Sequence, residues 1–304
     1  MIILVTGGAG HVGSHVVDAY LAAGHEVVVL DNLTTGHERN LNKGAKFYQG
    51  DICDGEMLRK LFEFYKFDVV NHHAAQIDVR RSVHEPLFDA EVNIIGSLRL
   101  IAAATQAAVR RFIYISTGGA VYGNPRRIPV TERDPVQPDC HYGISKHTPE
   151  HYLRLYQKLY GLEYVVLRYP NVYGPRQDPG GEAGVIAIFL GLMKAGKTPT
   201  IYGTGMEARD YVYVGDIARA NVKALERGTN EIICLGSRKA TTTRQIYEFC
   251  AAAVGFEGEP ALSLLRPGEI NRISLASAKA GKLLRWRAST PVAAGIKRTA
   301  KAMK

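Results

Sequence analysis

Two residues that could exchange a proton, Tyr142 and Lys146, stand in the short segment "HYGISK". A helical pattern, "SKHTPEHYLRLYQKLYG", continues from it, and a spacing of four places both side chains on one helical face. A tyrosine with a pKa of about 10 acts as a base at neutral pH only when a positive charge stabilises its phenolate. Lys146 could supply that charge, so the pair predicts acid–base chemistry.

Two hydroxyl side chains, Ser116 and Thr117, form a second candidate group. They follow the apolar run "RFIYI" and precede two glycines in "STGGAVYG". The carboxyl end of a strand is where an α/β enzyme places its chemistry. A hydroxyl there could share a substrate proton with Tyr142, or both hydroxyls could merely cap the strand end. The residues alone leave these alternatives open.

A glycine-rich turn, "TGGAGHVG", separates the first strand from the first helix. Gly7 would allow a tight turn, Gly10 would let backbone approach a phosphate, and Gly13 would let the helix pack on the strand. Asp31 ends the next strand, where its carboxylate could accept hydrogen bonds from the adenosine ribose and would repel a 2′-phosphate. Asn32, rather than an arginine, follows it. These features predict NAD, and not NADP, as the cofactor.

The elements that must position these residues alternate between strand and helix through the first half of the chain. Strand-like runs are Ile2–Thr6, Glu26–Asp31, Lys46–Gln49, Asp68–His72, Arg111–Ser116 and Glu163–Arg168. Helical patterns such as "HVVDAYLAAG", "GEMLRKLFEFYK" and "NIIGSLRLIAAATQAA" fill most of the gaps. Strands separated by helices, several of them apolar on both faces, predict an α/β fold with a doubly wound parallel sheet.

The second half of the chain has a looser pattern. Past Pro170, Gly- and Pro-rich loops surround short elements. We expect residues 1–169, with a returning segment at about 211–236, to form the cofactor-binding domain. Residues 170–304 would mostly form a smaller C-terminal lobe that holds the substrate.

The composition excludes several other classes of protein. The chain of 304 residues is 46% hydrophobic and 22% charged, as expected for a soluble globular protein. Its apolar runs are too short to span a membrane, and its opening segment lacks the basic residues of a signal peptide. The net charge of +9 is scattered rather than clustered, so we expect no nucleic-acid partner and no membrane partner.

The cysteines and histidines also indicate what kind of protein this is. The four cysteines have no C-x-x-C spacing, which favours reduced thiols in a cytoplasmic protein. His11, His72 and His73 lack a third ligand at metal-site spacing, so we expect no metal site.

Eight motifs occur along the chain in the order that is typical of one enzyme family. They are "TGGAGHVGSH", "DNLTTG", "HHAAQ", "STGGAVYG", "YGISK", "RYPNVYGPRQ", "RDYVYVGDIA" and "RPGE". On these motifs the chain resembles the extended short-chain dehydrogenase/reductase family, whose NAD-dependent members include epimerases and dehydratases of nucleotide sugars. The resemblance covers nearly the whole chain. It implies a Rossmann domain, NAD, a UDP-sugar substrate and a homodimer paired through helices 93–108 and 145–160.

The same resemblance implies roles for residues on the cofactor side. Tyr142 would be the acid/base at the sugar 4-hydroxyl, and Lys146 would lower its pKa and bond the nicotinamide ribose. The other cofactor positions that the resemblance implies are His11, Val12, Asp51, Ile52, Ala74, Ala75, Gln76, Asn93 and Tyr169. The family prefers phenylalanine where His11 stands, so we expect the His11 side chain to contribute packing.

One position departs from the family pattern. The family usually has Ser or Thr three residues before the Val of its V-Y-G, and here that residue is Gly118. When the position of the family's hydroxyl residue is counted back from Tyr142, it falls on Thr117 instead. The two glycines would let the backbone shift by one residue. We therefore predict Thr117 as the catalytic hydroxyl, with Ser116 as the alternative on the substrate side.

The second half of the chain resembles the UDP-sugar pocket of the family. The substrate positions that the resemblance implies are Asn171, Val185, Tyr202, Arg209, Arg266 and Glu269. Asn171 and the two arginines would contact the diphosphate, a task that suits the guanidinium fork. The backbone around Val185 would begin a helix whose N-terminus favours a phosphate. Tyr202 would stack on uracil, and Glu269 replaces the more usual Asp near the uridine ribose.

The reaction that the resemblance implies is epimerisation at C4 of a UDP-hexose, such as UDP-glucose or UDP-galactose, through a transient 4-keto intermediate. The main alternative is a 4-epimerase of UDP-glucuronate, UDP-xylose or a UDP-N-acetylhexosamine. A 4,6-dehydratase carries Asp-Glu directly before V-Y-G, where this chain has Gly119 and Ala120, which cannot transfer a proton. A non-catalytic NAD-sensing or nucleic-acid-binding module would have no need of the Tyr142 and Lys146 pair.

Overall fold

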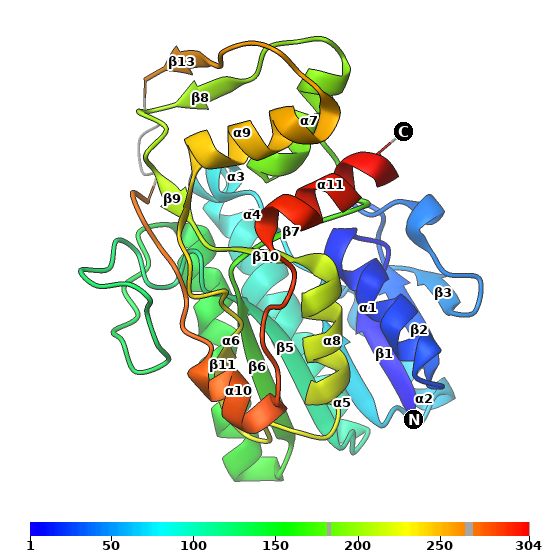
Figure 1. Cartoon of the computed structure of the whole chain (residues 1–304). Coiled ribbons are helices and arrows are strands. Elements are labelled where there is room, and N and C mark those ends of the chain that lie inside the picture. The colour runs from blue at the N-terminus through cyan, green and yellow to red at the C-terminus, as the bar shows by residue number, and fades with distance from the viewer. Residues whose placement is uncertain (181–183, 265–269, 304) are drawn as a thin grey trace.

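Residues 1–180, 184–264 and 270–303, which a computed structural model describes, fold around a seven-stranded sheet (Figure 1). The strands run in the order β3-β2-β1-β4-β5-β6-β11, and each neighbouring pair is parallel. They are β1 (Ile2–Thr6), β2 (Glu26–Asp31), β3 (Lys46–Gln49), β4 (Val69–His72), β5 (Arg111–Thr117), β6 (Glu163–Tyr169) and β11 (Glu231–Cys234). The strand order reverses at β1, and such a reversal opens a crevice at the carboxyl ends of the strands. The predicted doubly wound parallel fold is confirmed.

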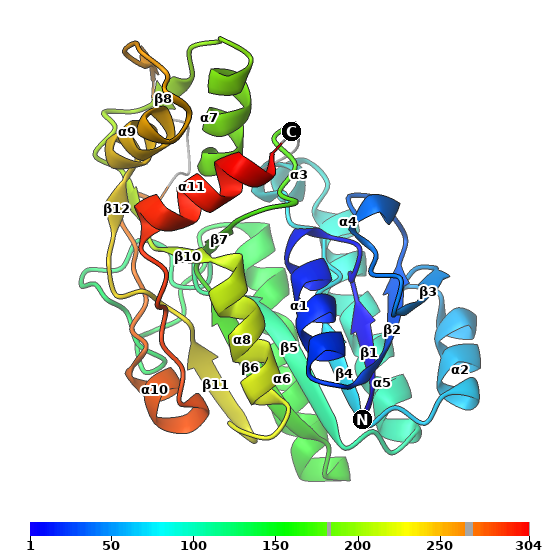
Figure 2. The same cartoon turned by 45° about the vertical axis from the view of Figure 1, so that its right-hand side comes forward.

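Helices cover both faces of the sheet. On one face lie α1 (His11–Ala22), α8 (Val214–Ala224) and α10 (Ala278–Leu284), and on the other lie α2 (Gly55–Phe64), α5 (Ser97–Gln106) and α6 (His141–Tyr160). Figure 2 shows α1 and α8 side by side on the first face. Because side chains alternate along a strand, Ile3 and Val5 join the first core and Leu4 joins the second. Burial on both faces explains why the central strands are largely apolar, whereas the edge strand β3 is only half-buried or exposed.

A smaller lobe lies beyond the carboxyl ends of the strands, opposite the N-terminus (Figure 1). Its elements are β7 (Asn171–Tyr173), α7 (Val185–Lys194), β8 (Thr200–Tyr202), β9 (Ala208–Arg209), β10 (Tyr211–Tyr213), β12 (Thr241–Thr242), α9 (Thr243–Val254), β13 (Ala261–Ser263) and α11 (Val292–Ala302). Phe189, Tyr247 and Ile296 bring α7, α9 and α11 into one core. The strands of the lobe form three two-stranded sheets within the described residues.

The chain returns from this lobe to the sheet twice. The first return supplies α8 and the edge strand β11. The second supplies α10 and Trp286, whose indole Nε1 donates a hydrogen bond of 2.7 Å to the carbonyl of Asp216. Residues 278–286, in the segment expected to be mostly substrate lobe, therefore pack on the core of the sheet domain.

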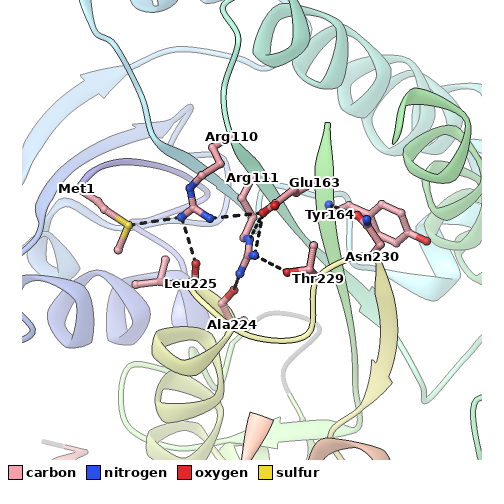
Figure 3. A network of polar contacts seen from close by, with 9 residues as sticks. All are labelled: Met1, Arg110, Arg111, Glu163, Tyr164, Ala224, Leu225, Thr229 and Asn230. Atoms are coloured by element: carbon pink, nitrogen blue, oxygen red, sulfur yellow. Dashed lines mark hydrogen bonds and ion pairs between the residues drawn. The ribbon is translucent and has the colours of Figure 1, made fainter. Parts of the chain in front are cut away.

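The amino ends of β5 and β6 are closed by a polar network (Figure 3). The buried Arg111 donates to Glu163 Oε2 at 2.8 Å, to the carbonyl of Ala224 at 2.9 Å and to Thr229 Oγ1 at 2.5 Å. The network joins two strands to the end of α8 and the loop after it. It anchors the sheet at the edge away from the small lobe.

The helical run predicted over 93–108 has a more complex form. The chain passes through α3 (Val79–His84), α4 (Pro86–Ala90) and a π-helix (Glu91–Gly96) before α5 begins. A π-helix holds one more residue per turn than an α-helix and often accompanies functional sites. A 3-10 turn (Glu38–Asn40) follows β2. Within the described ranges, no helix has both the length and the apolar character needed to cross a membrane.

Candidate active site

The side chains of Thr117 and Tyr142 meet at the carboxyl end of β5. Thr117 is the last residue of β5, Tyr142 is the second residue of α6, and a hydrogen bond joins their side chains. The hydroxyl of Tyr114 donates a bond of 3.0 Å to the carbonyl of Lys146, which fastens α6 to the same strand. The structure thus brings together the three residues that we predicted to be catalytic.

Burial sets the electrostatics of this group. It raises the pKa of Tyr142, while the hydrogen bond from Thr117 acts in the opposite direction. Burial also lowers the pKa of Lys146 to about 7, against the opposing charges of Asp89 and Glu150. The Lys146 Nζ lies 4.6 Å from the centre of the Tyr114 ring, a cation–π contact. The site therefore holds a phenol beside an ammonium that releases its proton unusually easily.

Ser116 and Thr117 point in different directions, as neighbours in a strand must. The Ser116 hydroxyl is buried and donates a bond of 2.6 Å to Glu150 Oε1. Glu150 in turn accepts two bonds from Arg168, at 3.0 and 2.5 Å. The structure brings Thr117, and not Ser116, to Tyr142.

The two glycines after Thr117 have different surroundings. A Cβ at Gly118 would overlap Leu275 Cδ1 and lie 2.9 Å from its Cδ2, so this position faces packed side chains. A Cβ at Gly119 would lie 3.5 Å from Asn171 Oδ1 and 3.7 Å from Thr117 Oγ1. Gly119 thus borders the group of Thr117 and Asn171, and the latter comes from the small lobe.

The glycine-rich turn has the geometry of an anion cradle. Gly7 has a φ of +70° and approaches Ala74 so closely that a Cβ would lie 2.6 Å from the Ala74 nitrogen. A Cβ at Gly13 would overlap the Gly7 carbonyl oxygen. Gly10 caps α1 without a side chain, so the amides at the start of α1, including those of His11 and Val12, receive no side-chain cap. Such an uncapped N-terminus suits a pyrophosphate.

The end of β2 places a buried carboxylate beside this cradle. Asp31 Oδ2 accepts a bond of 2.9 Å from the amide of Ala9, and Oδ1 accepts one of 2.9 Å from the amide of Leu33. Asn32 Nδ2 donates to Asp51 Oδ2 at 2.8 Å, next to the buried Ile52. Burial disfavours the Asp51 carboxylate, but hydrogen bonds from Cys53 and Asn32 outweigh it and lower the Asp51 pKa. Cradle, carboxylate and uncapped helix together fit a dinucleotide.

The loop after β4 is held in place from two sides. The amide of Ala74 donates to Thr6 Oγ1 at 3.3 Å, ahead of Ala75 in the same loop. The amide of Gln76 donates to Asn93 Oδ1 at 2.9 Å, and Asn93 Nδ2 returns a bond of 3.0 Å to the Gln76 carbonyl. The π-helix carries Asn93 to this loop.

Tyr169, a predicted cofactor residue, ends β6 at the carboxyl end of the sheet. Its hydroxyl accepts a bond of 2.6 Å from Asn221 Nδ2, and its ring centre lies 6.2 Å from that of His73. Burial lowers the pKa of His11 and of His73 to about 3, so both imidazoles are neutral at neutral pH. The Nε2 atoms of both are buried without a hydrogen-bond partner among the described residues.

The predicted substrate residues lie on elements of the small lobe. Val185 is the first residue of α7, which Gly184 caps without a side chain. Tyr202 ends β8, and Arg209 ends β9, where its Nη1 donates to the Ala208 carbonyl at 3.2 Å. The predicted Arg266 and Glu269 lie outside the described residues.

Three buried residues near Lys146 were not predicted from the sequence. Glu150 and Arg168 form an ion pair behind Ser116, and Asp89 on α4 is 1% exposed. Glu150 follows Lys146 by one helical turn, so the helical spacing could have indicated it. For Asp89 and Arg168 the local sequence holds no such signal.

Comparison with known proteins decides the family. The model of the NAD dependent epimerase/dehydratase family matches residues 3–236. The chain belongs to this family. The resemblance inferred from the motifs is therefore confirmed, and NAD, the predicted cofactor, is the one after which the family is described.

Similar proteins of this family match along nearly their whole length. The UDP-glucose 4-epimerase of Mycolicibacterium smegmatis is 43% identical over 98% of this chain and 97% of its own. The solved UDP-glucose 4-epimerase of Thermotoga maritima with UDP-glucose is 44% identical, with a TM-score of 0.98 over 99% of this chain and 98% of its own. That of Thermus thermophilus in complex with NAD is 42% identical, with a TM-score of 0.94 over 99% of this chain and 98% of its own.

Proposed function

We propose that this chain is a UDP-hexose 4-epimerase that interconverts UDP-glucose and UDP-galactose with NAD. The observation that carries the proposal is the hydrogen bond between Thr117 and Tyr142 beside Lys146, at the carboxyl ends of the sheet. The similar UDP-glucose 4-epimerases support the choice of substrate.

The cofactor would be held by residues already described. The cradle of Gly7, Gly10 and Gly13 would take the pyrophosphate, and Asp31 would accept bonds from the adenosine ribose. The remaining cofactor contacts would come from His11, Val12, Asn32, Asp51, Ile52, Ala74, Ala75, Gln76, Asn93, Lys146 and Tyr169. When bound, NAD supplies a reversible hydride acceptor for C4 of the sugar.

The protein side chains would manage the proton. Tyr142 would take the proton of the 4-hydroxyl and return it after the 4-keto sugar has turned over in the site. Lys146 would stabilise the Tyr142 phenolate, because burial alone raises the Tyr142 pKa. Thr117 would hold the sugar oxygen through its hydroxyl.

The small lobe would bind the UDP portion of the substrate. Asn171 and Arg209 would contact the diphosphate, and the N-terminus of α7 at Val185 would face a phosphate. Tyr202 would stack on uracil. Arg266 and Glu269 remain predictions for the diphosphate and the uridine ribose. On this proposal residues 1–169 and about 211–236 form the cofactor domain, and residues 170–304 mostly form the substrate lobe.

The test is turnover of a UDP-sugar panel by the purified chain with NAD. We expect UDP-galactose to be converted to UDP-glucose, and the Tyr142→Phe variant to lose nearly all turnover while it still binds UDP. Faster conversion of UDP-glucuronate, UDP-xylose or a UDP-N-acetylhexosamine would favour the alternative substrate. Loss of water from C5–C6 would indicate a dehydratase and contradict the proposal.

We also infer a homodimer through the side of the molecule formed by α4, the π-helix and α6. Large apolar side chains are exposed there: Leu87 at 85%, Ile144 at 50%, Leu155 at 46%, Leu159 at 60% and Tyr160 at 62%. Exposed apolar groups of this extent are typical of an interface. Sedimentation analysis should give a dimer, and Leu155→Glu with Leu159→Glu should give a monomer. A wild-type monomer at micromolar concentration would contradict this inference. All four cysteines are free thiols, which supports a cytoplasmic location.

A further inference from the structure

Asp89 is a buried carboxylate that lies behind the catalytic pair. It belongs to the short helix α4 and is 1% exposed. Its Oδ1 accepts hydrogen bonds from Gln76 Nε2 at 2.8 Å and from Asn93 Nδ2 at 3.1 Å. Both donors are neutral amides, and within the described part of the chain Asp89 forms no ion pair at contact distance. A buried carboxylate needs a compensating positive charge, so its partner must lie elsewhere in the site.

The buried ammonium of Lys146 likewise needs a compensating negative charge. The groups that face this ammonium are Glu150 on its own helix, His72 and His73 at and after the end of β4, Tyr114 on β5, and Asp89 on α4. Burial lowers the pKa of both histidines, so they carry no charge at neutral pH. Glu150 is bound directly to Arg168. Of the two carboxylates near Lys146, Asp89 is therefore the one without another cation as its partner.

A chain of hydrogen bonds joins Asp89 to the helix that carries Lys146. Asn93 Nδ2, which donates to Asp89, also lies 3.1 Å from Ser145 Oγ. The Ser145 hydroxyl donates to the carbonyl of Tyr142 at 3.2 Å. Asn93 reaches both partners because the π-helix places it between α4 and α6. Asp89 is therefore fixed relative to the first turn of α6.

We infer that Asp89 is a positioning residue whose carboxylate serves as the countercharge of Lys146 and keeps its ammonium charged inside the closed site. This inference rests on the proposed epimerase function, because it assigns Lys146 the task of stabilising the Tyr142 phenolate. Asp89 touches neither substrate nor reacting atoms, and it acts through its charge on Lys146 and Tyr142.

The inference has a direct consequence for pH dependence. Burial lowers the pKa of Lys146 to about 7, and Asp89 is the first of the charges that oppose this. Replacing the carboxylate by an amide removes a negative charge, so both Lys146 and Tyr142 would lose their protons at lower pH. A nearby charge shifts a pKa by about one unit or more.

The first experiment compares the pH profile of turnover for wild type, Asp89→Asn and Ser145→Ala. Asparagine keeps the shape and an acceptor oxygen of Asp89, so only the charge is lost. Both limbs of the Asp89→Asn profile should move down by about one pH unit. Ser145→Ala removes a hydrogen bond of the same cluster but no charge, so its profile should keep its position. A uniform loss of turnover without displacement of the profile would overturn the inference.

The second experiment needs no turnover, so it separates failure of this inference from failure of the proposed function. The folded-to-unfolded ratio is measured in urea at pH 6 for Asp89→Asn, Lys146→Met and the double variant. Asp89→Asn should reduce that ratio at least about tenfold more when residue 146 is lysine than when it is methionine, because methionine carries no charge that needs a partner. If Asp89→Asn alone fails to fold, Lys146→Met should restore folding. Equal effects in both backgrounds, or no restoration, would overturn the inference.

Discussion

Two buried cations, Arg168 and Lys146, lie near the carboxyl end of β5 and differ in how they are paired. Arg168 binds Glu150 through two nitrogens and donates from Nη1 to the Tyr122 hydroxyl at 2.6 Å. Burial acts against the Glu150 charge, but the close contact with His147 and the hydrogen bonds from Arg168 and Ser116 hold its pKa at about 2. Lys146 has an aromatic ring at its Nζ, and in the described residues no carboxylate reaches ion-pair distance.

The difference indicates that the charge of Arg168 stabilises the fold, whereas the charge of Lys146 is available for chemistry. The guanidinium of Arg168 has its bonds satisfied inside the protein, so it has little left to offer a ligand. The ammonium of Lys146 keeps its donors and has an unusually low proton affinity, as a group that takes part in proton transfer requires. The two adjacent hydroxyls differ in the same way. The Ser116 hydroxyl is bonded to Glu150 of the structural ion pair, and the Thr117 hydroxyl is bonded to Tyr142.

Breaking the closed pair should have the largest effect on stability. Arg168→Met leaves the Glu150 carboxylate buried without its partner, which should lower the free energy of unfolding by about 3–5 kcal/mol. Urea unfolding followed by circular dichroism measures the change. The double variant Arg168→Met with Glu150→Leu should recover part of the loss. A loss below about 1 kcal/mol in the single variant would refute the closed-pair interpretation.

Removing the other cation should affect turnover and not folding. Lys146→Met should reduce turnover on the order of 10³-fold, within the usual range for an acid–base group, because the Tyr142 phenolate loses its stabilising charge. Its free energy of unfolding should stay equal or rise, because the desolvation cost that lowers the Lys146 pKa to about 7 exceeds the attraction of Asp89, which is lost in the variant. Turnover and urea unfolding of one preparation measure both quantities. A Lys146→Met protein that unfolds more easily than wild type would show that Lys146, like Arg168, serves mainly to stabilise the fold.

The two hydroxyls give a sharper form of the comparison. Thr117→Val should reduce turnover on the order of 10²-fold with UDP binding unchanged. Ser116→Ala should change turnover less than tenfold and instead lower stability by about 1–2 kcal/mol, because it removes a buried hydrogen bond to a charged group. Initial rates and UDP titrations measure the difference. The reverse pattern would show that Ser116 is the catalytic hydroxyl.

The last expected effect is a pH dependence of stability, which is small over any one pH unit. The Lys146 pKa is about 7 in the folded state against an ordinary value of 10.5, so the folded state binds fewer protons between these values. The free energy of unfolding should therefore rise across this window by up to about 1.4 kcal/mol per pH unit from this group. Below pH 7 the cost of the buried charge is fully present. Lys146→Met should thus differ most from wild type at pH 6 and least near pH 10, and a constant difference would exclude this origin.

Much of the sheet could be predicted from the sequence, because most of its strands are buried between the same two helix layers. The bounds of β1, β2 and β3 agree with the predicted runs, and β4, β5 and β6 differ by one residue at one end. The π-helix could not be predicted, since the apolar pattern of 93–108 is compatible with an ordinary helix. Its extra residue depends on contacts that Asn93 makes with Gln76 and Ser145, far away in the chain.

The site was predictable where a residue's type alone indicates chemistry. Tyr142, Lys146, Asp31 and the glycines follow from spacing and from the ends of strands. Asp89 did not, because a charged residue on a helix is usually solvated, and its burial depends on partners from other segments. The surroundings of Gly118 likewise depend on a distant residue, because a side chain at this position would point at Leu275. A serine at position 118 would therefore meet Leu275 and would not restore the family's catalytic hydroxyl.

The late return of the chain to the sheet has a consequence for the order of folding. The edge strand β11 and the covering helix α10, with Trp286, come from residues 231–286, after the first elements of the small lobe have been made. During synthesis the earlier strands emerge first, yet the outer edge of β6 and part of the α8 surface stay uncovered until these residues arrive. The sheet domain therefore cannot finish folding before much of the small lobe has been made, and a nascent chain would need protection from aggregation over that interval.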